Sequence, residues 1–144
     1  MKTPQCNLEL YQGNDDIFVL KIEEVDNEGQ KSLADLSGYW FILRVRESSL
    51  KPVIMELTPD NRCIRLGVID DEGNFREAKV KETPHALQLH FPHDDTERLY
   101  APKYEYDLFG IKPDGVREVL LRGDIKVVRS ITYGKNCSQC CQHF

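Results

Sequence analysis

The sequence has no excess of basic residues, no long apolar run and few cysteines outside its last residues. Its 19 Lys and Arg are outnumbered by 24 Asp and Glu, giving a net charge of −5. This balance disfavours DNA or RNA as the main partner, because nucleic-acid binders need positive charge to attract phosphate. No apolar run approaches the roughly 20 residues that cross a bilayer, so we expect no membrane partner. The N-terminal stretch MKTPQCNLELYQG is polar where a signal peptide is apolar, so we expect no export by that route.

The cysteines divide the chain into two parts. Cys6 and Cys63 are isolated, whereas the other three of the five cysteines lie in the last eight residues. A disulfide framework normally spreads its cysteines through the chain, so we expect a reduced body. The sequence therefore predicts one β-sandwich domain over residues 1–133 and a separate Cys-rich C-terminal tail over residues 134–144.

The dominant hydrophobic period is two, which is typical of strands with one buried face. Turn signals separate the runs, and Lys112-Pro113-Asp114-Gly115 is the clearest hairpin signal. We expect Phe41, Leu43, Tyr106 and Leu108 to point inward from central strands. The alternating runs cover residues 8–10, 18–22, 39–46, 53–57, 87–91, 104–108 and 119–127.

The only helical signal lies near residues 94–99, where Asp94 is a potential N-cap with Glu97 three residues further on. About seven or eight short strands with one helical turn predict an all-β fold, an antiparallel β-sandwich that is immunoglobulin-like in general architecture. The strands follow one another too closely for crossover helices, so parallel pairing is not expected. A small barrel is the alternative. The less regular residues 63–83 are either a mobile insertion or an extra hairpin.

Enzyme motifs are missing from the sequence: there is no Gly-rich phosphate loop, no G-x-S-x-G and no H-E-x-x-H. We therefore expect no enzymatic activity, no catalytic residues and no bound cofactor. A metal-dependent enzyme would have to use His85, His90 and His93 beside Asp94 and Asp95, but exposed polar residues flanking a strand are the favoured interpretation.

The tripeptide Arg122-Gly123-Asp124 falls inside a strand run, where an integrin ligand would need an exposed loop tip. A glycine in a strand more often marks a bulge or a close approach of backbone, and we interpret Gly123 in this way.

The tail contains the one candidate metal site. Cys137, Cys140, Cys141 and His143 supply sulfur and nitrogen donors that suit zinc or another metal, and four ligands so close together favour a site shared between subunits. Docking of the tail on a neighbouring protein through Phe144 is slightly favoured over the metal, because four ligands within seven residues strain a single tetrahedral ion. A disulfide is a further alternative.

The strand at residues 39–46 carries large apolar side chains on both faces. Trp40 and Ile42 point the same way as Arg44 and Arg46, and large apolar groups beside arginine are common interface anchors. We predict Trp40, Ile42 and Phe144 as interface residues, unless the chain's own loops cover the two on the strand. A different use of the aromatics would be a sugar-stacking platform made by Trp40, Tyr100 and Tyr104.

Three blocks of the sequence resemble small structural proteins of tailed bacteriophages, from the tail tip, baseplate or collar. The blocks are LELYQGNDDIFVLKI (8–22), DLSGYWFILRVRESS (35–49) with PVIMELT (52–58), and YEYDLFGIKPDGVREVLLRGDIKVVRSIT (104–132). The chain departs from that pattern at Arg122, where an acidic residue is usual, and in its Cys-rich tail.

The resemblance implies an immunoglobulin-like virion protein with no enzymatic activity. Such a subunit would form a homo-oligomeric ring in the tail baseplate or collar and anchor neighbouring tail or fibre proteins. It would be made in the host cytoplasm and located in the virion. A carbohydrate- or receptor-binding sandwich is the alternative function.

Overall fold

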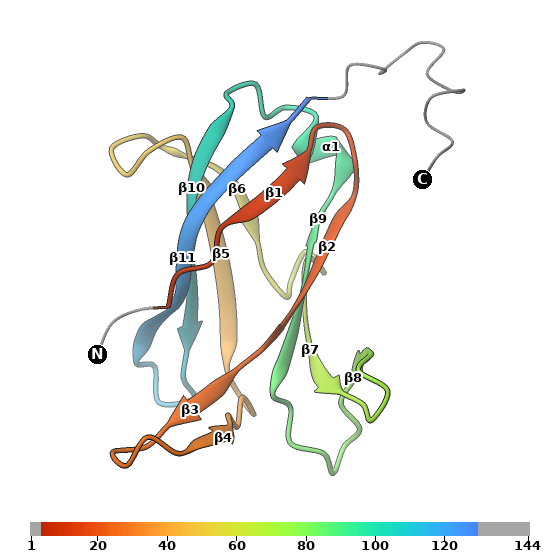
Figure 1. Cartoon of the computed structure of the whole chain (residues 1–144), viewed down its shortest axis with the longest axis vertical. Helices are drawn as coiled ribbons and strands as arrows, with labels where there is room; N and C mark the ends of the chain where they lie inside the picture. Colours follow the sequence, from red (N-terminus) through yellow and green to blue (C-terminus); the bar gives the residue numbers. More distant parts are fainter. Residues whose placement is uncertain (1–3, 130–144) are drawn as a thin grey trace.

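Two β-sheets pack face to face in the computed structural model, which describes residues 4–129 (Figure 1). Sheet A contains, in spatial order, β1 (Leu8–Tyr11), β11 (Arg117–Val128), β10 (Lys103–Ile111), β5 (Trp40–Arg46) and β6 (Val53–Leu57). Sheet B contains β2 (Asp16–Lys21), β9 (Ala86–Phe91), β7 (Ile64–Ile69) and β8 (Phe75–Glu77). A small hairpin of β3 (Glu23–Val25) and β4 (Lys31–Leu33) lies at one end of the sandwich, and the helical turn α1 (His93–Thr96) at the other.

The core lies between the two sheets and is built by the alternating residues that the sequence indicates. Phe41, Leu43, Tyr106 and Leu108 are all buried there, as predicted for central strands. Sheet B contributes Leu87, Leu89 and Phe91 from β9, and the rings of Phe18 and Phe91 form a T-shaped contact with centroids 5.8 Å apart. The predicted all-β sandwich is therefore confirmed.

One pair of strands is parallel, which corrects the expectation of purely antiparallel pairing. β1 runs parallel to β11, with Leu8 opposite Ile125 and Leu10 opposite Val127. The rule against parallel pairs applies to neighbours in sequence, which need a crossover connection. β1 and β11 are separated by the whole sandwich, so the rest of the chain serves as their connection.

A bulge in β11 interrupts the alternation that the sequence shows from residue 119 to residue 127. The β10–β11 register shifts between Leu108 and Phe109, so that Val119 pairs with Phe109 rather than continuing the inward row. Leu120 and Leu121 both pack against the core at this point. The prediction that Val119 shares the inward face of Leu121 is therefore wrong, because a bulge adds one residue and reverses the faces beyond it.

Residues 63–83 contain the extra hairpin, not a mobile insertion. β7 pairs with β8 through the turn at Asp70-Asp71-Glu72-Gly73, and β7 also pairs with β9, so it is an internal strand of sheet B. The Asp70 carboxylate accepts the backbone N–H groups of Glu72 and Asn74 and holds the turn together.

The helical turn begins one residue earlier than predicted, and Asp94 does not cap it. Its N-cap position is Pro92, without a side-chain hydrogen bond, and Asp94 lies inside the first turn. The carboxylate of Asp15 takes over this role because it accepts the His93 backbone N–H at 2.9 Å. No helix within the described residues is long and apolar enough to span a membrane.

Candidate functional site: the outer face of sheet A

The surface of sheet A that points away from sheet B is called the outer face here. The strand register places its side chains in rows that run across β6, β5, β10 and β11. Two rows are mainly apolar, although the row of Trp40 and Ile111 ends in Arg117 on β11, and two are charged. The face therefore has an apolar part next to the β3–β4 end and a charged part beyond it. Its side chains include those of Trp40, Ile42, Arg44, Arg46, Glu56, Glu105, Asp107, Phe109, Ile111, Val119, Arg122 and Asp124.

The apolar part is centred on β5 and β10. Trp40 lies opposite Ile111 and Ile42 opposite Phe109. Trp40, Phe109 and Ile111 are half-buried, although no second sheet formed by residues 4–129 covers this side. The guanidinium of Arg117 lies over the Phe109 ring, 5.3 Å from its centroid, at a distance typical of a cation–π contact.

Ile42, one of the predicted interface residues, is nearly buried on this face. Its side chain is only 5% exposed and therefore offers little surface to a partner, yet it does not belong to the buried core cluster. It lies in the middle of the outer face, between Trp40 and Arg44 along β5 and beside Phe109 on β10. These larger neighbours bury it, so Trp40 and Phe109 present the apolar surface instead.

The charged part begins one row further along the strands. Arg44 lies between Glu56 on β6 and Asp107 on β10, and Asp107 lies opposite Arg122 on β11. Arg44 Nε is 3.1 Å from a Glu56 carboxylate oxygen, and Arg122 Nε is 3.5 Å from an Asp107 oxygen. The signs therefore alternate across the four strands, which is the favourable order for neighbouring cross-strand side chains.

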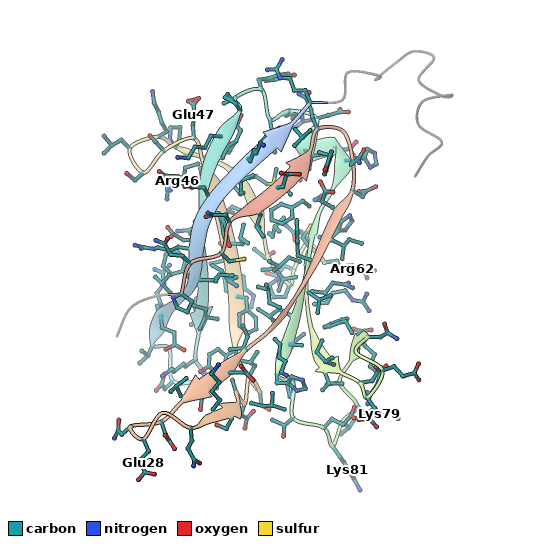
Figure 2. The ribbon with its side chains drawn as sticks, in the orientation of Figure 1. Glu28, Arg46, Glu47, Arg62, Lys79 and Lys81 are labelled. Atoms are coloured by element: carbon teal, nitrogen blue, oxygen red, sulfur yellow. The ribbon has the colours of Figure 1, made fainter. Side chains whose placement is uncertain are left out.

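The next row carries Arg46, Glu105 and Asp124. Asp124 is paired with Lys103, whose ammonium nitrogen is 3.4 Å away. Arg46 donates to the backbone oxygen of Lys51 at 3.1 Å, and among the described residues neither Arg46 nor Glu105 belongs to an ion pair. Figure 2 shows Arg46 on the side of sheet A that is turned away from sheet B. A shallow cavity of about 630 Å³ lies over these two charged rows.

Gly123 lies at the edge of this cavity, and its surroundings explain why the middle residue of the Arg-Gly-Asp tripeptide is a glycine. A Cβ atom at Gly123 would lie 2.0 Å from the backbone oxygen of Cys6, so the glycine permits the close approach of backbone that the sequence predicted. The same oxygen accepts the Tyr106 hydroxyl at 2.6 Å. The tripeptide lies within β11 and not on a loop tip.

The histidines form a separate contact at the opposite end of sheet B from the β8–β9 loop. His90 Nε2 lies 3.0 Å from Asp15 Oδ1, and His93 Nδ1 lies 3.2 Å from Asp15 Oδ2. His85 is buried at the other end of β9, where its Nε2 accepts the Ile69 backbone N–H. The three histidines therefore do not converge, and within residues 4–129 no group of three metal-ligating side chains is arranged to hold an ion.

Asp15 joins the β1–β2 turn to the start of α1 through its charge. The hydrogen bond from His90, followed by the backbone N–H of His93, lowers the Asp15 pKa to about 2 from 3.8. The hydrogen bond to Asp15, followed by the charge of Asp94, raises the His93 pKa above 6.5. Sequence reasoning missed Asp15 because it lies in a turn, 75 positions from His90, and nothing local to it signals the contact.

Asp15→Asn should lower the melting temperature most between pH 3.8 and 6.5. The lowered Asp15 pKa stabilises the fold above 3.8, and this stability is lost as the pH falls towards 2. The raised His93 pKa stabilises the fold below 6.5, and this stability is lost as the pH rises through the folded-state pKa. The pH dependence of the melting temperature is measured by circular dichroism melts of the wild type, Asp15→Asn and the control Asp60→Asn, which changes an aspartate in another turn. A wild-type advantage over Asp15→Asn that is the same at every pH would contradict this role.

The predicted aromatic platform for sugars is not formed. Tyr104 is 5% exposed and its hydroxyl oxygen accepts the Ala101 backbone N–H. Tyr100 is 69% exposed but lies before the start of β10, whereas Trp40 pairs with Ile111 at its end. The three aromatics therefore do not share an exposed surface. The remaining predicted residues, Cys137, Cys140, Cys141, His143 and Phe144, and the whole tail 134–144, lie outside the described residues.

Comparison with known proteins does not assign the chain to a family. No protein-family model matches the chain, and no curated protein matches it. A chain from the crystal structure of ICOS in complex with ICOS-L and an anti-ICOS-L VNAR domain is 15% identical, with a TM-score of 0.30. The match covers 89% of this chain and 56% of that chain. The class of the protein, an all-β sandwich, rests on the two sheets themselves.

Proposed function

We propose that the chain is a non-enzymatic structural protein of a tailed-phage virion. It would be a baseplate or collar subunit that forms a ring and anchors neighbouring tail or fibre proteins. The three sequence blocks that resemble such proteins supply every strand of sheet A, together with β2. The resemblance thus covers a complete structural unit and not scattered turns.

The observation that carries the proposal is the outer face of sheet A. It presents Trp40, Phe109 and Ile111 as a half-buried apolar patch, bordered by the arginine and carboxylate rows. An apolar patch with aromatic anchors and neighbouring arginines is typical of a protein–protein interface. A subunit that is held among neighbours needs such a face, whereas an isolated protein gains nothing from exposing it.

Trp40→Ser tests the assignment in particles. The variant should keep the β-sheet circular dichroism of the wild type, because Trp40 lies outside the core cluster. Its incorporation into purified tails, measured by immunogold electron microscopy and quantitative mass spectrometry, should fall by about tenfold or more, since loss of an anchor aromatic costs about 2 kcal/mol or more of binding.

The matched control is Tyr100→Ser, because Tyr100 is an exposed aromatic away from the outer face. It should be incorporated as well as the wild type. Absence of the wild-type protein from purified virions would refute the virion assignment. Equal incorporation of both variants would refute the role of the outer face.

Replacing His90 and Asp94 together with alanine tests the non-enzymatic part of the proposal. Among the described residues, the histidine–aspartate contacts that involve His90 and Asp94 come closest to an acid–base pair. Assembly and infectivity of the double variant should both remain close to wild type. Complete loss of infectivity by virions that contain the folded double variant in normal amounts would indicate chemistry at this position.

A further inference from the structure

We propose that a second copy of this chain docks on the outer face of sheet A, related to the first by a two-fold axis. The axis runs parallel to the strands and passes between β5 and β10. This inference goes beyond the virion assignment and does not depend on it, because it rests on the order of side chains across the sheet.

A rotation of 180° about this axis exchanges the two strands on either side of it and then the next two. β5 of one copy therefore faces β10 of the other, and β6 faces β11, while positions along the strands are unchanged. Each row of the outer face meets the same row of the second copy in reversed order. A two-fold interface of this kind is favourable only when a row is complementary to its own reverse.

The row of Arg44 satisfies this condition. It reads Glu56, Arg44, Asp107 and Arg122 across β6, β5, β10 and β11. After the rotation, Arg44 faces Asp107 of the second copy, and Arg122 faces Glu56. The symmetry repeats both pairs, so this row gives four attractive contacts between the two copies and no repulsive one.

The next row brings together the two charges that have no ion-pair partner among the described residues. Arg46 and Glu105 are neighbours on β5 and β10, so the rotation places Arg46 of each copy opposite Glu105 of the other. These two contacts lie on the strands beside the axis, at the charged end of the interface. Partial removal from water strengthens such pairs relative to exposed ones.

The apolar rows are complementary in the same way. Trp40 of one copy faces Ile111 of the other, and Phe109 lies over Ile42, which its own neighbours already bury. These side chains lie on the two strands next to the axis, where two sheets packed about 10 Å apart interdigitate their side chains. The apolar patch, which has no cover within the described chain, becomes the centre of the contact.

The balance of charge favours a second copy over a strongly acidic or basic partner. Arg44, Arg46, Lys103 and Arg122 are matched by Glu56, Glu105, Asp107 and Asp124. A partner of one sign would attract half of these groups and be repelled by the other half, at a cost in affinity. The alternating order fits a surface that carries the same order reversed.

The test uses the purified full chain and two charge reversals at the pair Arg46–Glu105. Sedimentation equilibrium of the wild type should show a monomer–dimer equilibrium that weakens as salt is raised. Arg46→Glu and Glu105→Arg should each weaken the dimer by about tenfold or more, because each variant places like charges opposite each other twice. Lys21→Glu, on sheet B, makes the same change in net charge as Arg46→Glu and should leave the dimer unchanged.

Mixing the two reversed variants gives the sharpest readout. At positions 46 and 105 the Arg46→Glu variant carries two carboxylates and the Glu105→Arg variant two guanidinium groups. The two variants should therefore form a heterodimer, although each is mainly monomeric alone. Circular dichroism melts check that both variants are folded, and the salt dependence of the wild type gives a measure that needs no variant.

Three results would overturn the proposal. The first is a wild type that stays monomeric at concentrations up to about 1 mM, where even weak specific dimers form. The second is a dimer that Arg46→Glu does not weaken. The third is that the two folded variants do not associate on mixing. None of these results affects incorporation into virions, so failure of this proposal is distinguishable from failure of the proposed function.

Discussion

Phe41→Ala should lower the free energy of unfolding by about 3–5 kcal/mol, the range for truncating a buried aromatic ring. Phe41 is 1% exposed on β5, which lies between β10 and β6 in sheet A, and its ring stacks on that of Tyr39 with centroids 5.8 Å apart. Alanine would leave a cavity between the two sheets that the surrounding strands cannot fill. Urea titration followed by circular dichroism gives the difference directly.

The matched control is Ile54→Ala on the neighbouring strand β6, since Ile54 is 48% exposed. Its effect should stay below about 1 kcal/mol, as for other surface truncations. A loss of the same small size for Phe41→Ala would mean that the inward face of β5 has been misassigned.

Gly123→Ala should lower the free energy of unfolding by about 2–5 kcal/mol, the sum of a steric clash and a lost buried hydrogen bond. The added methyl group would lie 2.0 Å from the Cys6 backbone oxygen, and backbone cannot move aside as a side-chain end can. The segment before β1 must then separate from β11. The Tyr106 hydroxyl would lose its acceptor, although it is buried.

Gly110→Ala is the control for this clash. There the added methyl group would meet Leu120 Cδ1 at 2.9 Å, the end of a flexible side chain that can rotate away. The free energy of unfolding should therefore fall less than for Gly123→Ala. Equal losses for the two variants would show that the N-terminal segment yields easily and is not held by β11.

The sequence predicts the inward faces of the strands because a period of two is a local pattern that burial on one face imposes. Phe41, Leu43 and Leu108 follow it without exception. The bulge beside Leu108 and the parallel β1–β11 pair were not predictable in the same way, since both depend on which strand lies alongside. Pairing between distant strands leaves no local mark on either of them.

The candidate site was predicted in part for the same reason. Trp40 and Arg44 share a face by strand periodicity, and the structure places them on the outer face. Phe109 was missed although it continues the alternation of Glu105 and Asp107, which could have identified it. The burial of Ile42 was not predictable, because it depends on the side chains across from it on β10.

The parallel pairing of β1 with β11 has a consequence for the time at which the protein folds. Asn7 accepts the backbone N–H of Asp124, 117 positions away in sequence. During synthesis β1 emerges from the ribosome long before β11 has been made, so β1 stays unpaired during that interval. Contacts so distant in sequence form slowly. Until they form, the unpaired β1 exposes Leu8 and Leu10, which are buried in the folded protein, and can associate with other unfolded chains. β11, the last of the described strands to be made, is therefore the one that completes sheet A. A shorter interval between the synthesis of β1 and that of β11 would reduce the risk of aggregation.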